Sequence, residues 1–556
     1  MQALETLLKE EKSTPWSQIK SGELADLLFQ VAENFYIEGD FLVSDTAAHM
    51  GVTPTSVWFE VIFPSVWGLL STATFLNSPD RRQIPLGQLP IVIPKANKLL
   101  GKHQAVSMMP SNNFDRLFFP GFSGYLFLGD SQDKITINSF GGLALCLLPF
   151  NSLSIGVLDI LHLLCHGPYR VVAKFSEKNE FLRPHLENIF SPLILMKALK
   201  IVEGGVEVGS RLIAQPRFDR IHLTGSRQTS DAIKKNIGSK LFTSELGGVT
   251  PVIIFPEVIK DQKLLCYAAR QLTYGALANN GQHCVSYQVI IVPESGQAAL
   301  SKVLISEMGL KCSAADQHSP KRLLIDEMAT MKAKRIVDNA IQCGATACPS
   351  PCEPNGRQFP VTLITGITTE MKIFQEEIFG PIVGIMSLPD HDFANEAVKI
   401  MNHPRLLGDL GASLYTANPD SEKIHQTVCH LKHGIIGINC YPGLAFATSL
   451  PWGAGVEGSS GKGWVHNYQF LTESYFHKVV IKTSLKPNGF GFIKWEDPWL
   501  HNVSNQAALR LAKSIVNATI AFFKKQSIRF MAALIIMLPS LVLREIIAYK
   551  KDCIKE

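Results

Sequence analysis

The sequence lacks the cysteine pattern of a disulfide-rich or zinc-binding protein. Its eleven cysteines form no even framework, and the cluster Cys343, Cys348 and Cys352 has no histidine or further cysteine at zinc-ligand spacing. A secretory signal is missing too, because residues 1–12 are charged and have a helical pattern. We therefore expect a reducing, cytoplasmic compartment and no metal site.

Charge is sparse and unevenly placed. Charged residues make up 18% of the chain and hydrophobic residues 46%, which is the composition of a folded protein. Residues 506–556 carry nine Lys and Arg against three Asp and Glu, a charge of +6, whereas the whole chain of 556 residues carries +5. The rest of the chain is thus about neutral, and we expect no nucleic-acid partner.

The apolar stretch 141–165 is interrupted by Pro149, Asn151 and Asp159, so it predicts a strand, a turn and a helix rather than a membrane span. Residues 1 to about 120 look mainly helical, and 125–130 with 134–138 predict a β-hairpin. Beyond them, strands alternate with helices, which is typical of a parallel α/β fold. The expected strands are 143–148, 170–173, 198–202, 220–223, 251–255, 287–292, 361–365, 382–387, 412–415, 434–439 and 478–482.

The motif Asn-Asn-Gly-Gln-His-Cys at 279–284 follows a helical pattern and precedes a strand. A thiol on such a loop, five residues after the amide of Asn279, is typical of a nucleophile. A single cysteine is also often a small buried hydrophobic residue, so Cys284 needs a base, an oxyanion donor and a cofactor site elsewhere. His283 adjoins the thiol, but neighbouring side chains usually diverge.

Two polar residues are candidates for the base and the oxyanion donor. Glu245 lies in Ser-Glu-Leu-Gly-Gly, where two glycines permit a tight turn that would aim the carboxylate into a cleft. Asn151 follows a strand and precedes a helix, where its amide can donate to an oxyanion. Each has a structural alternative, namely a solvated loop glutamate and a capping or turn asparagine.

Candidates for cofactor contacts follow the ends of two strands. Lys174 and Glu177 stand at the end of 170–173, where parallel α/β folds hold a nucleotide ribose. Thr-Gly-Ser at 224–226 opens a helix and predicts a pyrophosphate site, although Gly-x-Gly-x-x-Gly is absent. Glu-Glu-Ile-Phe-Gly-Pro at 376–381 adds an acid and an aromatic ring on one loop.

Six motifs, in this order and spacing, resemble the aldehyde dehydrogenase superfamily over about residues 120–482. They are Pro-Phe-Asn at 149–151, Lys-Phe-Ser-Glu at 174–177, Leu-Thr-Gly-Ser at 223–226, Glu-Leu-Gly-Gly at 245–248, the cysteine motif at 279–284 and the motif at 376–381. The resemblance implies an α/β fold with two Rossmann-like domains and a β-arm that joins subunits into a homodimer or homotetramer.

The resemblance also implies a role for each matched residue. Cys284 corresponds to the nucleophile, Glu245 to the base that activates the deacylating water, and Asn151, with the Cys284 backbone N–H, to the oxyanion hole. Contacts to a nicotinamide dinucleotide are implied for Lys174, Glu177, Gly225, Ser226, Glu377 and Phe379. The implied activity is oxidation of an aldehyde to a carboxylic acid with NAD, or NADP as the alternative; the carboxylate of Glu177 would repel a 2′-phosphate, which favours NAD.

Several positions depart from the family pattern. Phe150 stands where Trp is usual, and Arg227 and Ser230 replace a common Thr and Gly near the expected pyrophosphate. Pro-Trp-Gly-Ala-Gly at 451–455 replaces Pro-Phe-Gly-Gly. These changes mark a divergent member and bear on cofactor affinity rather than on the chemistry of Cys284.

By the same resemblance the chain divides into six parts. These are the helical N-terminal part of the cofactor domain at 1–121, the oligomerisation hairpin at 122–140, the NAD(P)-binding domain at 141–245, the catalytic domain at 246–433, the return to the cofactor domain with the oligomerisation strand at 434–485, and a C-terminal extension at 486–556.

The extension contains two helical segments. Residues 506–523 are amphipathic, and 530–543 are almost wholly apolar but, at 14 residues with Pro539 among them, too short to span a membrane. Basic residues flank the second segment, so 506–551 predicts either an interfacial anchor on anionic lipid or a tail packed on its own domain or a partner subunit. An anchor would suit long-chain aldehydes.

Two other functions stay open from the sequence. A CoA-acylating enzyme of the same family usually lacks the base, so Glu245 argues against it. A catalytically silent, membrane-associated member is favoured by the altered glycine positions, and opposed by the intact Cys284, Asn151 and Lys174.

Overall fold

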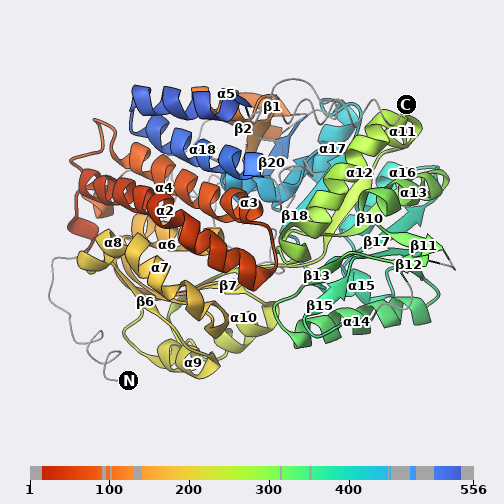
Figure 1. Cartoon of the computed structure of the whole chain (residues 1–556), viewed down its shortest axis with the longest axis horizontal. Coiled ribbons are helices and arrows are strands. Elements are labelled where there is room, and N and C mark those ends of the chain that lie inside the picture. Colours follow the sequence, from red (N-terminus) through yellow and green to blue (C-terminus); the bar gives the residue numbers. More distant parts are fainter. Residues whose placement is uncertain are drawn as a thin grey trace.

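The computed structural model describes residues 16–89, 96–100, 103–128, 141–313, 316–349, 353–448, 450–452, 476–483 and 506–539. Two large sheets dominate it, with helices packed around them (Figure 1). The predicted α/β class is thereby confirmed.

The smaller of the two has five parallel strands in the order β6-β5-β4-β7-β8. Its strands are β4 (Gly142–Leu147), β5 (Tyr169–Lys174), β6 (Leu199–Val202), β7 (Arg220–Gly225) and β8 (Leu241–Leu246). The helices around it are α6 (Leu153–His166), η4 (Glu177–Leu182), α7 (Arg183–Ile189), α8 (Ser191–Leu195), α9 (Val206–Ala214) and α10 (Arg227–Lys234). The central strand β4 is apolar from Leu143 to Leu147, and most residues of β5 and β7 beside it are buried.

The structure corrects the expected turn at Glu245. This residue lies inside β8, paired in register with Thr224 of β7, and the two glycines follow it. The sequence hides β8 because its first half, Leu-Phe-Thr, is exposed or only partly buried and the strand has no long apolar run.

The larger sheet has eleven strands in the order β1-β2-β3-β20-β19-β18-β9-β10-β17-β16-β14. Its strands are β1 (Lys98–Leu100), β2 (His103–Met109), β3 (Ser123–Leu128), β9 (Thr250–Ile254), β10 (Tyr287–Pro293), β14 (Thr346–Cys348), β16 (Thr362–Thr365), β17 (Ile382–Leu388), β18 (Gly411–Tyr415), β19 (Ile435–Ile438) and β20 (Phe476–Lys482). Its helices are α11 (Pro256–Lys260), α12 (Gln262–Leu277), α13 (Gln297–Glu307), α14 (Glu327–Gln342), α15 (Lys372–Gln375), α16 (Phe393–Met401) and α17 (Glu422–His430). Two small antiparallel pairs, β11 (Lys311–Ser313) with β12 (Asp316–His318) and β13 (Lys321–Leu323) with β15 (Gln358–Pro360), lie beside it.

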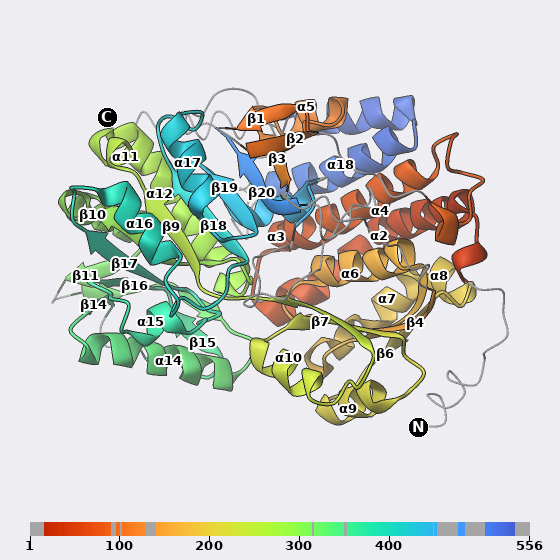
Figure 2. The same ribbon diagram turned by 180° about the vertical axis from the view of Figure 1, so that it is seen from behind.

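The predicted hairpin of 125–130 with 134–138 is wrong in its pairing. Strand β3 pairs antiparallel with β2 on one edge and with β20 on the other, so neither edge is left for 134–138. Figure 2 shows β19, β20, β3, β2 and β1 following one another across this end of the sheet. Residues 134–138 themselves lie outside the described residues.

Two cysteines form a disulfide, although the sequence predicts no disulfide framework. Cys312 of β11 and Cys348 of β14 form a disulfide with their Cα atoms 5.5 Å apart. The sequence separation of 36 conceals this contact in the sequence. Among the described residues no group of His, Cys, Asp and Glu is arranged to hold a metal ion.

Helices of the N-terminal part pack between the sheets and the tail. They are α2 (Ser21–Met50), α3 (Pro54–Val57), the π-helical turn η2 (Trp58–Ile62) and α4 (Phe63–Leu76), with the short α5 (Asn113–Phe118) nearby. In the described part of the chain, the run Pro54–Leu76 is the one helix long and apolar enough to cross a membrane, and 72% of it is buried inside the protein. It has the character of a core helix.

The first tail helix, α18 (Gln506–Phe523), packs on the chain's own N-terminal helices (Figures 1 and 2). Its apolar face buries Leu511 and Ile515 completely, and the ring of Phe523 meets Trp67 edge-on at 5.4 Å. Glu33 of α2 binds the tail cations Lys524 and Arg529 at 3.0 and 2.8 Å. For α18 the alternative of packing on its own chain therefore holds. The helix Ser527–Pro539 that follows it keeps several apolar side chains exposed.

Candidate functional site

A cleft of about 900 Å³ opens at the carboxyl ends of β4, β5 and β7. Parallel α/β sheets bind ligands at this edge, because the loops that follow each strand converge there. All nine residues singled out in the sequence line it. They are Asn151, Lys174, Glu177, Gly225, Ser226, Glu245, Cys284, Glu377 and Phe379.

Cys284 stands at the end of a tightly held loop, residues 278–284, which we call the cysteine loop. Asn279 and Asn280 both have left-handed backbone conformations, with φ of 47° and 59°, which asparagine tolerates better than most residues. The amide of Asn280 donates to the carbonyls of Met50 and Leu323 at 2.7 and 3.0 Å. The loop is thereby fixed to α2 on one side and to β13 on the other.

Gly281 brings the cysteine loop against the loop that carries Glu377 and Phe379. Its φ is +75°, and a Cβ placed on it would lie 2.3 Å from the carbonyl oxygen of Gly380. A residue with a side chain cannot occupy this point without separating the two loops. Glycine at 281 is thus required for Cys284 and Glu377 to face the same cleft.

Asn151 is bound to the cysteine loop by two hydrogen bonds. Its Nδ2 donates to the carbonyl of Gln282 at 2.8 Å, and its own carbonyl accepts from Nδ2 of Asn279 at 2.8 Å. An asparagine amide carries two hydrogens, so the Asn151 side chain, which lines the cleft, has a second donor besides this bond. The predicted oxyanion donor is therefore held beside the thiol by the residue that opens the motif.

Glu377 approaches Cys284 across Gly247. A Cβ on Gly247 would lie 2.2 Å from Oε1 of Glu377 and 3.3 Å from Cβ of Cys284. Gln288 of β10 holds this acidic loop in place, since its amide donates to the carbonyls of Ile373 and Glu376 at 2.7 and 2.8 Å. Its oxygen accepts from the backbone N–H of Ile378 at 2.9 Å. The sequence gives no sign of this role, because Gln288 stands in an ordinary strand.

Burial increases the proton affinity of the two reactive groups. Burial, followed by the charges of Asp159 and Asp409, raises the pKa of Glu245 well above its usual range. Both carboxyl oxygens of Glu245 are buried with no hydrogen-bond partner among the described residues. Burial and then the charges of Glu245 and Glu377 raise the pKa of the Cys284 thiol. In its ionised form, a carboxylate of raised pKa is a stronger base than an ordinary glutamate, and it is suited to take the proton of the thiol.

The walls of the cleft fit a dinucleotide. Lys174 and Glu177 lie side by side at the end of β5, and burial lowers the pKa of Lys174. A Cβ on Gly205 would come within 2.6 Å of the Glu177 carboxylate, so the glycine leaves that acid its place. Ser226 caps α10 through a 3.1 Å bond from the N–H of Thr229, and the open N-terminus of this helix suits a phosphate group.

Lys332 was not anticipated from the sequence, and the position of Phe150, noted there as a departure from the family pattern, is now defined. Lys332 of α14 lines the cleft and its charge acts on Glu377, whose pKa burial raises to about 7. The ring of Phe150 meets Phe379 edge-on at 5.8 Å, so the Phe that replaces the usual Trp keeps an aromatic contact across the cleft. A basic residue within an amphipathic helix gives no sequence signal for such a position.

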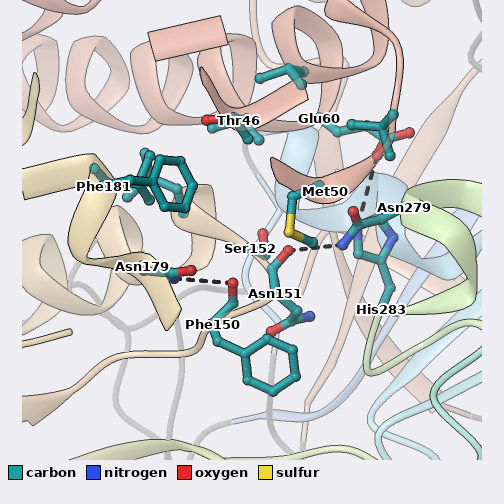
Figure 3. A pocket seen from close by; sticks show the side chains of 15 residues that line it. Thr46, Met50, Glu60, Phe150, Asn151, Ser152, Asn179, Phe181, Asn279 and His283 are labelled. Carbon is teal, nitrogen blue, oxygen red and sulfur yellow. Dashed lines mark hydrogen bonds and ion pairs between the residues drawn. The ribbon is translucent and has the colours of Figure 1, made fainter. Parts of the chain in front are cut away.

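His283 points to a different space from its neighbour Cys284. Its imidazole lines a second cavity of about 30 Å³ together with Glu60, Asn151 and Asn279 (Figure 3). Nδ1 lies 3.2 Å from the Tyr441 hydroxyl, and Nε2 lies 3.9 Å from Oε2 of Glu60. The expected divergence of the two side chains is observed. We call this space the small cavity.

Comparison with known proteins finds similarity to aldehyde dehydrogenases. The sequence profile of the Aldehyde dehydrogenase family matches residues 129–479, more than half of the chain. A probable coniferyl aldehyde dehydrogenase of Pseudomonas aeruginosa is 28% identical over 319 residues, which are 56% of this chain and 63% of that relative. The chain thus spans less than two thirds of the length of that protein.

Two solved structures share the fold. A betaine aldehyde dehydrogenase of Staphylococcus aureus, solved with NAD⁺, superposes with a TM-score of 0.61 at 19% identity, over 88% of this chain and 87% of its own. A glyceraldehyde-3-phosphate dehydrogenase of Methanocaldococcus jannaschii, solved with NADP, gives 0.62 at 19% identity, over 84% and 91%.

Proposed function

We propose that this chain, which belongs to the aldehyde dehydrogenase family, oxidises an aldehyde to a carboxylic acid with a nicotinamide dinucleotide as the electron acceptor. The observation that carries the proposal is the convergence of Cys284, Asn151 and Glu245 on one cleft whose other walls suit a dinucleotide. Each of the three is supplied by a different segment of the chain, so their meeting is not a result of sequence proximity.

The residues perform the reaction in two halves. Glu245 takes the proton of Cys284, and the thiolate adds to the aldehyde carbon to give a thiohemiacetal whose oxyanion accepts from Asn151 and from the Cys284 N–H. A nicotinamide dinucleotide held by Lys174, Glu177 and Ser226 would accept the hydride that leaves the thiohemiacetal, and Cys284 would then carry a thioester. Glu245 releases the thiol proton to solvent and then deprotonates a water that adds to the thioester, and the departing Cys284 thiolate takes this second proton as the acid is released.

NAD is the cofactor we favour over NADP. Glu177 stands at the end of β5 beside Gly205, where its carboxylate can accept from ribose hydroxyls and would repel a 2′-phosphate. A ratio of kcat/KM values that favours NADP would overturn this preference and leave the oxidation itself standing.

The test is NADH formation with a panel of aldehydes of increasing chain length. Cys284→Ser should abolish turnover, whereas Cys343→Ser, which changes an exposed cysteine outside the cleft, should not. Glu245→Gln should lower the steady-state rate of NADH formation by about 1,000-fold, because it removes the base from both halves of the reaction. Turnover that survives Cys284→Ser, or no turnover with any aldehyde by folded protein, would contradict the proposal.

The same assay addresses the rival functions. A CoA-acylating enzyme would form product only with CoA present, whereas the cleft with Glu245 predicts CoA-independent acid. A silent family member would bind the dinucleotide without turnover.

We further propose a cytoplasmic homodimer or homotetramer. β3 and β20, which lie in one sheet, were expected to form the oligomerisation arm. The mass of the purified protein in solution tests this assembly.

The association of 506–551 with anionic vesicles tests the predicted membrane contact, for which the exposed face of Ser527–Pro539 is the remaining candidate.

A further inference from the structure

The small cavity contains a carboxyl group for which the reaction above has no use. Glu60 is the one charged residue in the apolar run Pro54–Leu76, and it stands on the π-helical turn η2. A buried acid is expensive unless hydrogen bonds satisfy it. The contacts of Glu60 are long: 3.4 Å to the Tyr274 hydroxyl and 3.9 Å to Nε2 of His283. Burial raises its pKa to about 8.

Two more oxygen atoms in the walls of this cavity are unsatisfied. Oγ1 of Thr46 and Oδ1 of Asn179 are buried without a hydrogen-bond partner among the described residues. The amide nitrogen of Asn179 already donates to the carbonyl of Phe150 at 3.0 Å, so the oxygen is the atom left over. Figure 3 shows Thr46 and Glu60 above, and Asn179 beside, the central Asn151. Oxygen acceptors of this kind suit a ligand rich in N–H donors.

The position of the cavity relates it to the substrate. It shares Phe150 and Asn151 with the large cleft, and it borders the cysteine loop through Asn279 and His283. A dinucleotide in the large cleft leaves the remote end of an aldehyde bound at Cys284 to occupy another space. The small cavity is such a space, because it adjoins the cleft at Phe150 and Asn151, although the Cys284 side chain itself does not line it.

We infer that the small cavity receives a primary ammonium group of the substrate, with Glu60 as its counter-ion, so that the enzyme prefers short ω-amino aldehydes. This inference rests on the proposed oxidation and names its substrate class. A volume of about 30 Å³ accommodates a group the size of one or two waters, hence an –NH₃⁺ but not a trimethylammonium.

His283 is compatible with a cation next to it. Burial lowers its pKa to about 4, so the imidazole is neutral and does not repel an ammonium. With its Nδ1–H donated to the oxygen of Tyr441, its Nε2 accepts from the ligand. The rings of Tyr274 and Tyr441, edge-on at 5.6 Å, add aromatic surface near the site. The ammonium draws Glu60 into its ionised form, which releases one proton on binding at neutral pH.

The test compares 3-aminopropanal with butanal, which match in chain length and differ in the charged terminus. Wild-type protein should show a higher kcat/KM for 3-aminopropanal, and Glu60→Gln should reduce the ratio of the two values by about 100-fold, mainly through KM, because a charged pair is lost from a buried site. Glu23→Gln, an exposed acid of α2, should leave the ratio unchanged. Betaine aldehyde should be oxidised more slowly than 3-aminopropanal.

A second measurement does not depend on turnover. Alkylation of Cys284 by iodoacetamide should be slowed by n-propylammonium but not by 1-propanol, and Glu60→Gln should abolish the protection. Glu60→Asp, which keeps the charge on a shorter side chain, should retain part of it, and thermal unfolding of each variant checks that it is folded.

The outcomes separate the two proposals. Butanal oxidised as well as 3-aminopropanal, or equal protection by both propyl compounds, would mean that the cavity holds water only, and would overturn this inference while aldehyde oxidation stands. Failure of every aldehyde, with selective protection by propylammonium, would overturn the proposed oxidation and leave the ammonium site.

Discussion

At the scale of single residues, the site depends on side chains that are buried against their chemical preference. Glu245, Glu377 and Glu60 are all carboxyls whose pKa is raised by burial. Such groups cost stability, and proteins keep them where the shifted proton affinity is used. Glu245 lies in the large cleft with the Cys284 thiol, and Glu60 lies in the small cavity beside His283.

Glu60 should make the stability of the protein depend on pH. A glutamate in the unfolded chain ionises near pH 4.5, whereas the folded protein retains the proton to about pH 8. The contribution of this group to the free energy of unfolding is therefore complete below pH 4.5 and is lost as pH rises to 8, by on the order of 5 kcal/mol in total. Glu60→Gln cannot ionise, so its stability relative to the wild type should increase between pH 5 and 8.

Urea unfolding of the two proteins at pH 5, 6.5 and 8 measures this difference. Glu23→Gln serves as the control, since an exposed acid should give a difference that is flat with pH. A flat difference for Glu60→Gln as well would show that Glu60 has an ordinary pKa in the folded protein.

At the scale of elements, the cysteine loop is a short segment held from every side. Asn280 joins it to α2 and β13, Asn279 joins it to Asn151, and Gly281 lets it touch the loop of Glu377. None of these contacts is a backbone–backbone hydrogen bond of a helix or a sheet. The precision of the site thus comes from side-chain amides that bind backbone carbonyls across the domain.

Gly281→Ala should displace this loop. The substitution adds the strain of a positive φ, about 1 kcal/mol, and a collision with the Gly380 carbonyl that only a backbone shift relieves. We expect activity to fall by about 100-fold, since Cys284 and the cofactor contacts lose their alignment. Steady-state rates and melting temperatures measure both effects.

Gly238→Ala is the matched control for that variant. Its φ is +63°, but no atom lies within 4 Å of the added Cβ. Gly238→Ala should lower the stability only by the strain of its positive φ, and it should leave the rate of aldehyde oxidation unchanged. Equal loss of activity in the two variants would mean that close approach at Gly281 is not what positions the thiol.

At the scale of the whole molecule, the tail is part of the folded body. α18 covers α2 and α4, and Glu33 ties the segment after it to α2. The N-terminal helices would otherwise present an apolar surface to water, and α18 removes that surface by packing on it.

Leu511→Ala should therefore destabilise the whole protein. Leu511 is fully buried between α18 and the N-terminal helices, and its truncation should cost about 3 kcal/mol. Ile528→Ala, in the same tail but 88% exposed, should change stability by less than about 0.5 kcal/mol. Chemical denaturation measures both, and a similar small effect for the two would show that α18 is not docked in solution.

The sequence by itself determined the local features of this protein. It predicted most strands, the helix at 506–523, and nine residues that the structure brings to one cleft. These predictions succeed because apolar periodicity and strand-end motifs are properties of neighbouring residues. Glu245 shows the limit, since the residue was found while its strand β8 was not.

Only the tertiary structure decided which distant segments meet. Strand β3 pairs with β2 and with the distant β20, and Cys312 forms a disulfide with Cys348. Glu60 lies beside His283, more than 200 residues along the chain. Backbone hydrogen bonds are the same for any pair of strands, so pairing is set by the packing of side chains over the whole core rather than by local propensity. The same holds for a buried acid, whose partner is known only once the helix that carries it has docked.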